Sequence, residues 1–203
     1  MKLLAVYFIL FLTWLIFSCQ PETRQELPTM KQDPHSFSKP AEALVTHLNW
    51  KAKLDFNTKI IEAKASWTIE STPEAKEIIF DTKELTIEKV TLNEDEPAIY
   101  KLGDPDAILG QPLTISIKSG TKTVTIVYKT HPKAEALQWL SPQQTGDKKN
   151  PFLFTQSEAI LARSWIPCQD SPSIKFTYES EVTVPPDLLA LMSASNPQEK
   201  NEQ

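Results

Sequence analysis

The chain has 203 residues, which is enough for one domain of ordinary size. Apolar residues make up 40% and charged residues 23%, a balance typical of a globular protein, and the net charge of −5 argues against a nucleic-acid surface. The four glycines lie too far apart in the sequence to form a glycine-rich phosphate-binding loop.

The first residues have the pattern of an export signal. Lys2 supplies a positive charge, and residues 3–17 form a nearly uninterrupted apolar run, shorter than the roughly 20 residues of a membrane-spanning helix. Ser18 and Cys19 follow, as in a bacterial lipoprotein signal, where the cysteine is acylated and becomes the mature N-terminus. We therefore predict a signal peptide over residues 1–18, a lipid on Cys19, and an exported protein anchored to a membrane of the bacterial envelope or periplasm. The alternative is a short uncleaved anchor with an incidental cysteine.

A polar tether and then a β-hairpin are expected next. Residues 19–45 are polar and punctuated by proline, which is typical of a flexible linker. Apolar and polar residues then alternate over residues 48–56 and again over residues 61–69, around a turn at Asn57-Thr58-Lys59. A period of two indicates strands with one buried face.

More strands are expected along the rest of the chain. Residues 78–80 and 85–92 predict two strands separated at Asp81-Thr82-Lys83, and residues 113–117 and 124–128 predict a second hairpin.

The last part of the sequence holds two further runs. Residues 176–184 alternate again, and residues 188–192 form an apolar run that we interpret as a strand without a partner. No helical period occurs downstream of the signal. The sequence therefore predicts an all-β fold, with a twisted sheet over a second, smaller one.

Residues 130–175 show neither a strand nor a helix pattern. Long irregular segments in a compact domain are usually functional or disordered. This one contains Trp139, Phe152, Phe154 and Trp165, so we expect it to be ordered and to carry the function.

A search for catalytic groups by spacing finds none. The histidines are His35, His47 and His131, and no two are four residues apart, so the zinc-binding pattern His-Glu-x-x-His is absent. A Gly-x-Ser-x-Gly elbow is also absent, although composition leaves a Ser-His-Asp arrangement open. We expect no catalytic residue, metal ligand or cofactor in this chain.

Several segments in the same order resemble one family. They are residues 80–90 (FDTKELTIEKV), 136–140 (ALQWL), 152–156 (FLFTQ) and 156–172 (QSEAILARSWIPCQDSP). This order resembles the N-terminal domain of the M1 zinc aminopeptidases related to leukotriene A4 hydrolase. The resemblance implies a saddle-like β-sandwich of mostly antiparallel strands, like the N-terminal domain of aminopeptidase N.

The resemblance also implies partners and limits. The folded domain is expected over residues 46–203, incomplete at its C-terminal end, and the zinc of the complete enzyme is expected in a missing catalytic domain. The expected partners are therefore that domain, the N-termini of peptides, and a membrane through the lipid anchor.

Three site residues follow from the resemblance. It implies that Glu158 pairs with the free α-ammonium group of a peptide substrate, that Gln156 lines the first specificity pocket, and that Ala159 brings the backbone close to the substrate. A carboxylate in a dehydrated cleft binds an ammonium group strongly. The epoxide-hydrolysing branch has Gln at the position of Glu158, so this sequence favours a plain aminopeptidase. The alternative is an exposed Glu158 paired with a nearby Lys or Arg.

The remaining polar residues of this segment have structural interpretations. We expect Arg163 and Asp170 to form a hydrogen-bonded pair that fixes the loop. Cys168 lies among apolar residues without an adjacent His or Lys, which predicts an inert core thiol.

Two hypotheses for function remain open. The first is the substrate-recognition domain of an exported zinc aminopeptidase, inactive alone. The second is a stand-alone β-sandwich lipoprotein that acts as a binding or interaction module.

Overall fold

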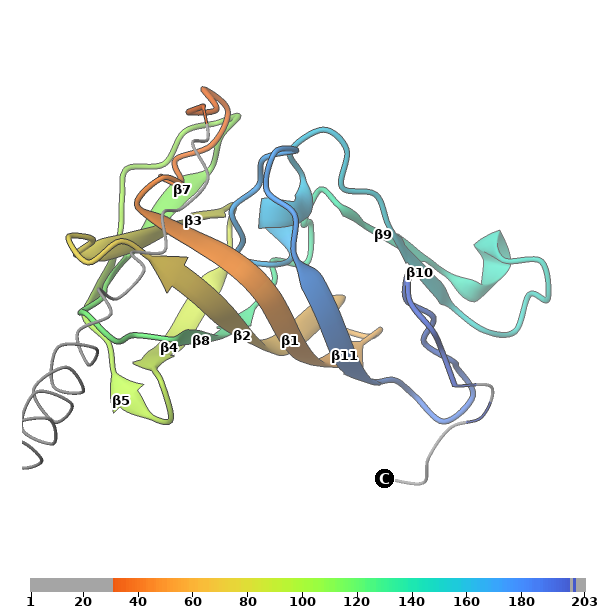
Figure 1. The fold of residues 1–203 in the computed structure, drawn as a ribbon. Helices are drawn as coiled ribbons and strands as arrows, with labels where there is room; N and C mark the ends of the chain where they lie inside the picture. Colours follow the sequence, from red (N-terminus) through yellow and green to blue (C-terminus); the bar gives the residue numbers. More distant parts are fainter. Residues whose placement is uncertain (1–30, 198, 200–203) are drawn as a thin grey trace, which may run out of the picture.

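The computed structural model describes residues 31–197 and residue 199, and strands account for most of the regular structure there (Figure 1). The strands are β1 (Ala43–Asp55), β2 (Ile60–Ser71), β3 (Glu77–Thr82), β4 (Thr86–Leu92), β5 (Glu96–Pro97), β6 (Tyr100–Leu102), β7 (Gln111–Ser116), β8 (Thr123–Lys129), β9 (Leu137–Leu140), β10 (Phe152–Thr155) and β11 (Thr177–Thr183). Two short 3₁₀ helices lie among the last strands of this part, η2 (Pro142–Gln144) between β9 and β10, and η3 (Ala162–Ser164) between β10 and β11. The predicted all-β fold is confirmed.

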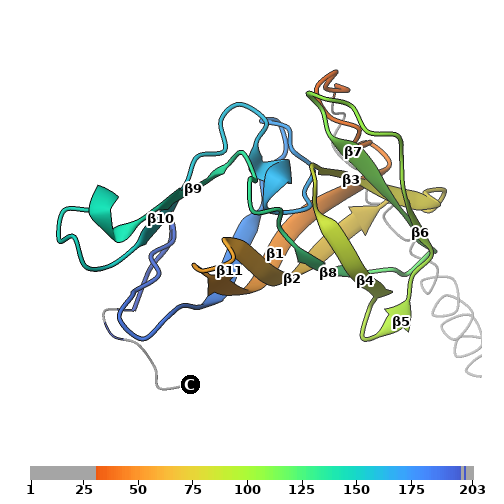
Figure 2. The same cartoon turned by 180° about the vertical axis from the view of Figure 1, so that it is seen from behind.

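The larger sheet has six strands in the order β11-β1-β2-β8-β4-β5. The predicted hairpin is confirmed, because β1 and β2 pair antiparallel around a turn in which Lys59 has a φ of 58°. Strand β11 pairs with the other edge of β1 and runs parallel to it, whereas the other neighbours in this sheet are antiparallel. The sheet is strongly twisted in both ribbon views (Figures 1 and 2).

The smaller sheet has three strands in the order β3-β7-β6. The predicted hairpin of residues 113–117 with residues 124–128 is therefore wrong, because β7 pairs with β3 and β6 while β8 pairs with β2 and β4. The chain instead crosses from one sheet to the other through Gly120, which has a φ of 85°. Alternation shows which side of a strand is buried, but it does not identify the strand with which it pairs.

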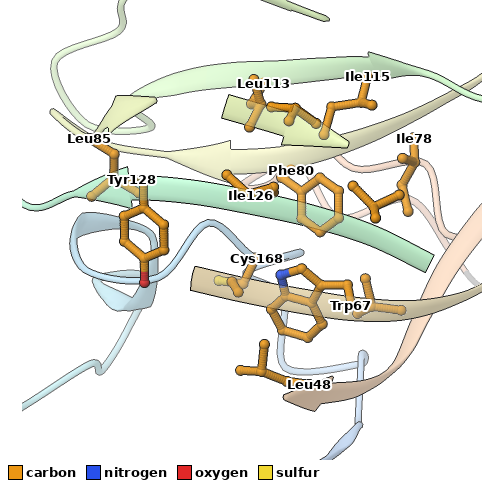
Figure 3. Packing of buried hydrophobic residues seen from close by; sticks show 14 of the residues in the cluster. Leu48, Trp67, Ile78, Phe80, Leu85, Leu113, Ile115, Ile126, Tyr128 and Cys168 are labelled. Atoms are coloured by element: carbon orange, nitrogen blue, oxygen red, sulfur yellow. The ribbon is translucent and has the colours of Figure 1, made fainter. Parts of the chain in front are cut away.

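The core lies between the two sheets. On β2 the alternate residues are buried, as the period predicts, and Trp67 is fully buried among them. Trp67 packs against Phe80 of β3, with their ring centroids 6.0 Å apart. Figure 3 shows Leu113 and Ile115 of the small sheet on one side of Phe80, and Trp67 on the other. Burial of large side chains of this kind contributes about 1.5–3 kcal/mol each.

The segment that carried no sequence pattern contains a third, two-stranded sheet. Strands β9 and β10 form an antiparallel hairpin, and η3 follows it before β11. The hairpin extends away from the two main sheets (Figure 2). Its base is held by Trp139, whose ring meets Phe56 edge-on at a centroid distance of 5.0 Å. The expectation that this segment is ordered is confirmed.

The folded part of the chain begins within the predicted tether of residues 19–45 and not at residue 46. Strand β1 begins at Ala43, and Ser36 and Ser38 are already buried against the domain. These two serines are polar, but they are hydrogen-bonded inside the protein, which composition does not reveal. The predicted signal peptide and Cys19 lie outside the described residues. Within the described part, no helix is long and apolar enough to span a membrane.

The predicted final strand at residues 188–192 is wrong. This stretch follows β11 without regular structure, and Leu189 and Leu191 are exposed. Asn196 closes it, since its side-chain oxygen accepts from the N–H of Met192 at 2.8 Å and its amide nitrogen donates to the Met192 carbonyl at 2.8 Å. At Met192 the side chain therefore supplies the backbone hydrogen bonds that a neighbouring strand would otherwise supply.

Candidate functional site

The three residues that the sequence assigns to substrate binding follow β10 directly. Gln156 extends the pairing of β9 and β10 by one residue, because its N–H donates to the carbonyl of Ala136 at 2.9 Å. Its side-chain oxygen then accepts from the N–H of Glu158 at 2.9 Å, which turns the chain away from the hairpin. Gln156, Glu158 and Ala159 are all exposed, and the Glu158–Ala159 peptide bond is cis.

The Glu158 side chain has no ion-pair partner among the residues that the structure describes. The alternative of a surface carboxylate paired with a nearby Lys or Arg is therefore not what the described part of the chain shows. An exposed, unpaired carboxylate remains available to a cation supplied from outside. In water such a pair alone is weak, at about 0–1 kcal/mol, so strong binding of an ammonium group needs a cover that excludes solvent.

The turn that carries Glu158 is closed by its own hydrogen bonds. The N–H of Leu161 donates to the carbonyl of Ser157 at 2.9 Å, and η3 follows immediately. The indole N–H of Trp165 donates to the hydroxyl of Ser157 at 3.1 Å. The hydroxyl of Ser164 donates to the carbonyl of Leu161 and accepts from the N–H of Ala136. Residues 156–165 are thus tied to one another and to the start of β9, which fixes the position of Glu158.

An aromatic pair beneath the turn joins it to the large sheet. Trp165 packs edge-on against Trp50 of β1, with ring centroids 5.4 Å apart. Tyr128 of β8 donates its hydroxyl proton to the carbonyl of Trp165 at 2.8 Å and accepts from the indole N–H of Trp50 at 3.0 Å. Burial raises the pKa of Tyr128 well above its usual value, although the bond from Trp50 opposes that shift.

Arg163 is completely buried. It lies at the centre of a network of hydrogen bonds, which we name the support, that holds the loop of residues 156–171 in place. Its Nε donates to Asp170 at 3.0 Å, and Asp170 also accepts from the backbone N–H of Arg163. The guanidinium group further donates to the carbonyls of Leu109, at 2.7 Å, and His35, at 2.8 Å. The predicted Arg163–Asp170 pair is confirmed, and it fixes the loop. Burial raises the pKa of Asp170, and the bonds from Arg163 oppose that rise.

Cys168 lies inside this support and is buried. It forms an isolated backbone bridge with Asp81 of β3, and beside it the carbonyl of Pro167 accepts from the indole N–H of Trp67 at 3.0 Å. Figure 3 shows Cys168 next to Trp67 in the core. Burial raises the pKa of the Cys168 thiol, so the reactive thiolate is disfavoured and the predicted core role is confirmed.

No group of three or more His, Cys, Asp or Glu side chains capable of holding a metal ion occurs within residues 31–197. The three histidines lie apart from one another: His35 is beside Asp33, His47 contacts Thr177 of β11, and His131 lies 3.8 Å from Glu84. This donor set does not fit a zinc site.

Two elements of the support were missed from the sequence. Asp81 was interpreted as the break between two strands, but it is fully buried within β3 and accepts from Ser36 and from the N–H groups of Phe37 and Asp170. An aspartate that directly follows the apolar run Ile78-Ile79-Phe80 is the signal that could have revealed it, because buried carboxylates require partners. Tyr128 was included only as part of the strand predicted at residues 124–128.

Comparison with known proteins identifies the family. The family model described as the Peptidase M1 N-terminal domain matches residues 45–203. The chain belongs to the M1 peptidase family. It is 42% identical over 177 residues to leukotriene A-4 hydrolase of Xenopus laevis, covering 84% of this chain and 29% of that protein. It is 35% identical over 161 residues to leucine aminopeptidase 2 of Pyricularia oryzae, covering 76% of this chain and 26% of that protein.

Solved structures agree with this assignment. Yeast leukotriene A4 hydrolase in complex with bestatin superposes with a TM-score of 0.70 at 28% identity, over 81% of this chain and 27% of that chain. An M1 zinc metallopeptidase from Deinococcus radiodurans, at 16% identity, shares the fold with a TM-score of 0.55 over 71% of this chain and 33% of that one. The chain thus spans less than a third of the relatives' length, and it is homologous to the N-terminal domain of M1 aminopeptidases.

Proposed function

We propose that this chain is the substrate-recognition domain of a zinc aminopeptidase that removes N-terminal residues from peptides. In this proposal the Glu158 carboxylate binds the free α-ammonium group of the peptide. Gln156 shapes the pocket for the first side chain, and Ala159 allows close approach of the substrate. A site that pairs with an ammonium group rejects a blocked N-terminus, because an acetylated amine leaves the carboxylate unpaired.

The observation that carries the proposal is an unpaired carboxylate on a rigid support. Glu158 is exposed and has no ion-pair partner in residues 31–197, while the turn that holds it is fixed by buried hydrogen bonds from Tyr128 and Arg163. Such rigidity keeps a charged group in place for a ligand without the entropic cost of ordering it on binding. Membership of the M1 family supports the choice of a peptide amine as that ligand.

The chain's own residues supply binding and not hydrolysis in this proposal. The described residues hold no donor set for zinc, so we assign them no part in activating water. The metal would be held by other parts of the parent enzyme.

A chimera tests the assignment. Residues 31–203 of this chain would replace the matching N-terminal part of the Pyricularia oryzae leucine aminopeptidase 2, and hydrolysis of a leucyl chromogenic substrate would be measured. The Glu158→Gln change keeps the shape and removes the charge, so we expect kcat/KM to fall roughly 30- to 1000-fold. Asp104→Asn, at an exposed carboxylate outside the candidate site, is the matched control and should change kcat/KM less than about twofold.

Blocked substrates give a second test in the same chimera. We expect acetylated peptides to be cleaved far more slowly than free ones, and the Glu158→Gln variant to lose most of that discrimination. Equal cleavage of free and acetylated peptides, or an unchanged kcat/KM in the variant, would show that the amine-binding role is wrong.

We also propose that the protein is exported and lipid-anchored. The support is the apolar run of residues 3–17 followed by Ser18 and Cys19. Accumulation of the precursor under an inhibitor of the lipoprotein signal peptidase would support this proposal.

A further inference from the structure

The segment before β1 contributes to the support of the candidate site. Residues 33–38, which we name the N-terminal strap, lie upstream of residue 45, where the family match begins. Polar composition predicted that they belong to a flexible tether, but Ser36 and Ser38 are buried and hydrogen-bonded to each other at 2.7 Å. The strap therefore belongs to the folded body.

Asp81 connects the strap to the small sheet. The hydroxyl of Ser36 donates to one carboxylate oxygen of Asp81 at 2.6 Å, and the N–H of Phe37 donates to the other at 2.8 Å. Asp81 has no exposed surface, so its carboxylate takes its hydrogen bonds from these protein donors and not from water. Removal of one donor from a buried carboxylate costs more than removal of an exposed hydrogen bond, because water does not replace it.

The same carboxylate also holds the candidate loop. The oxygen that accepts from Ser36 accepts from the N–H of Asp170 at 2.9 Å, and it lies 3.9 Å from the guanidinium nitrogen Nη2 of Arg163. That nitrogen donates to the carbonyl of His35 in the strap at 2.8 Å. The strap and the loop therefore share one buried carboxylate and one buried guanidinium group, so neither can move without breaking a charge-assisted bond.

A second contact closes the other end of the strap. The hydroxyl of Ser171, just past the buried pair, donates to Asp33 at 2.6 Å. This bond, followed by the N–H of His35, lowers the pKa of Asp33. The strap thus touches the loop on both sides of Asp170, while η3 and the bond from Leu161 to Ser157 connect Arg163 to the turn of Glu158.

We propose that the N-terminal strap and Asp81 position the candidate amine-binding turn, with Asp81 and Ser36 as positioning residues that do not touch the substrate. This inference rests on the proposed function for its meaning, but its first test does not require catalysis. The strap sets the orientation of Arg163, and Arg163 lies in η3, which closes the C-terminal end of the turn that presents Glu158.

Amide hydrogen exchange on the full chain measures the order of the turn. The reporters are the N–H groups of Gln156, Leu161 and Ser164, which donate within the turn or to Ala136 just before β9. The reference is the set of amides in β2. In the Ser36→Ala variant we expect the three reporters to exchange about tenfold faster, with β2 changed less than about twofold. In Asp81→Asn the new amide NH₂ group faces a donor in either orientation, the N–H of Phe37 or the N–H of Asp170, so we expect a larger increase.

Lys39→Ala is the matched control. Lys39 follows the strap directly and pairs with Glu77 at 3.0 Å on the surface, without contact to Asp81. We expect it to leave the reporters unchanged. If Asp81→Asn does not fold, Ser36→Ala alone decides the question. Unchanged reporters in Ser36→Ala, or an equal rise in the reporters and in β2, would overturn the proposal, because the second result indicates a loss of global stability.

Kinetics of the chimera separate this inference from the proposed function. If both hold, Ser36→Ala raises KM several-fold with kcat nearly constant, because a loosened turn is less often ready to bind. Faster exchange of the reporters with unchanged KM would support the strap and would overturn the amine-binding role of the turn.

Discussion

The Tyr128 hydroxyl donates to the backbone carbonyl of Trp165 at 2.8 Å, and it is the direct polar link between the large sheet and the turn that carries Glu158. The same oxygen accepts from the indole N–H of Trp50, so one buried hydroxyl satisfies two partners. The loss of this hydroxyl has consequences that can be measured in the chain alone.

Replacement of Tyr128 by Phe is expected to destabilise the fold by about 1–3 kcal/mol. The ring keeps its packing, but a buried indole N–H and a buried carbonyl each lose a partner. Chemical denaturation followed by tryptophan fluorescence gives the free energy of unfolding. Tyr178→Phe is the control, since the Tyr178 hydroxyl makes no hydrogen bond among the residues the structure describes, and its effect should stay within about 0.5 kcal/mol. Similar losses in the two variants would contradict the bridging role.

Alkaline pH is expected to weaken the fold through the same residue. Burial raises the pKa of Tyr128 in the folded state, whereas in the unfolded chain it titrates near 10. The stabilisation is therefore complete below pH ~10 and is lost as pH rises further, by up to about 1.4 kcal/mol per pH unit for one proton. The pH dependence of unfolding should be shallower by one proton in Tyr128→Phe. Cys168, whose pKa is also raised, is present in both proteins and drops out of the difference.

Zinc content is expected to be low in the purified chain. The three histidines are separated in sequence and in the described structure, and no cluster of ligands occurs in that part. Elemental analysis after dialysis should find well under one zinc per chain, and aminoacyl chromogenic substrates should not be cleaved. Turnover that a chelator abolishes would show that the chain carries its own metal site.

Lipid anchoring predicts a processing defect under an inhibitor of the lipoprotein signal peptidase. The precursor should accumulate, because cleavage before Cys19 requires that enzyme. A Cys19→Ala variant should no longer partition with membranes. A protein of the same size with and without the inhibitor, together with membrane-bound Cys19→Ala, would favour the uncleaved anchor instead.

The sequence predicted the parts of the fold that depend on local pattern. Alternation identified β1, β2 and β11, because one buried face imposes a period of two whatever the partner. It also located β7 and β8, but it gave them the wrong partner, because their apolar sides face one core from opposite sheets. The apolar run at residues 188–192 was wrongly interpreted as a strand, and there the Asn196 side chain bonds the backbone of Met192.

In the candidate site, too, contacts between residues close in sequence were predicted and contacts between distant residues were not. Arg163 and Asp170 were paired correctly because they are close in sequence and opposite in charge. Asp81 and Ser36 were missed because 45 residues separate them, and their bond exists only when the strap lies against the small sheet. The roles of Glu158, Gln156 and Ala159 come from resemblance, and the experiments above test them.

The parallel pairing of β11 with β1 has a consequence for the order of folding. His47 is paired with Thr177, 130 residues later in the chain. Contacts across such a sequence separation form late, because a long loop must close before they stabilise anything. The segment with Glu158 lies inside that loop, between β8 and β11. We expect the β1–β2 hairpin to form early during refolding and the candidate site to acquire its shape only in the last step, when β11 docks.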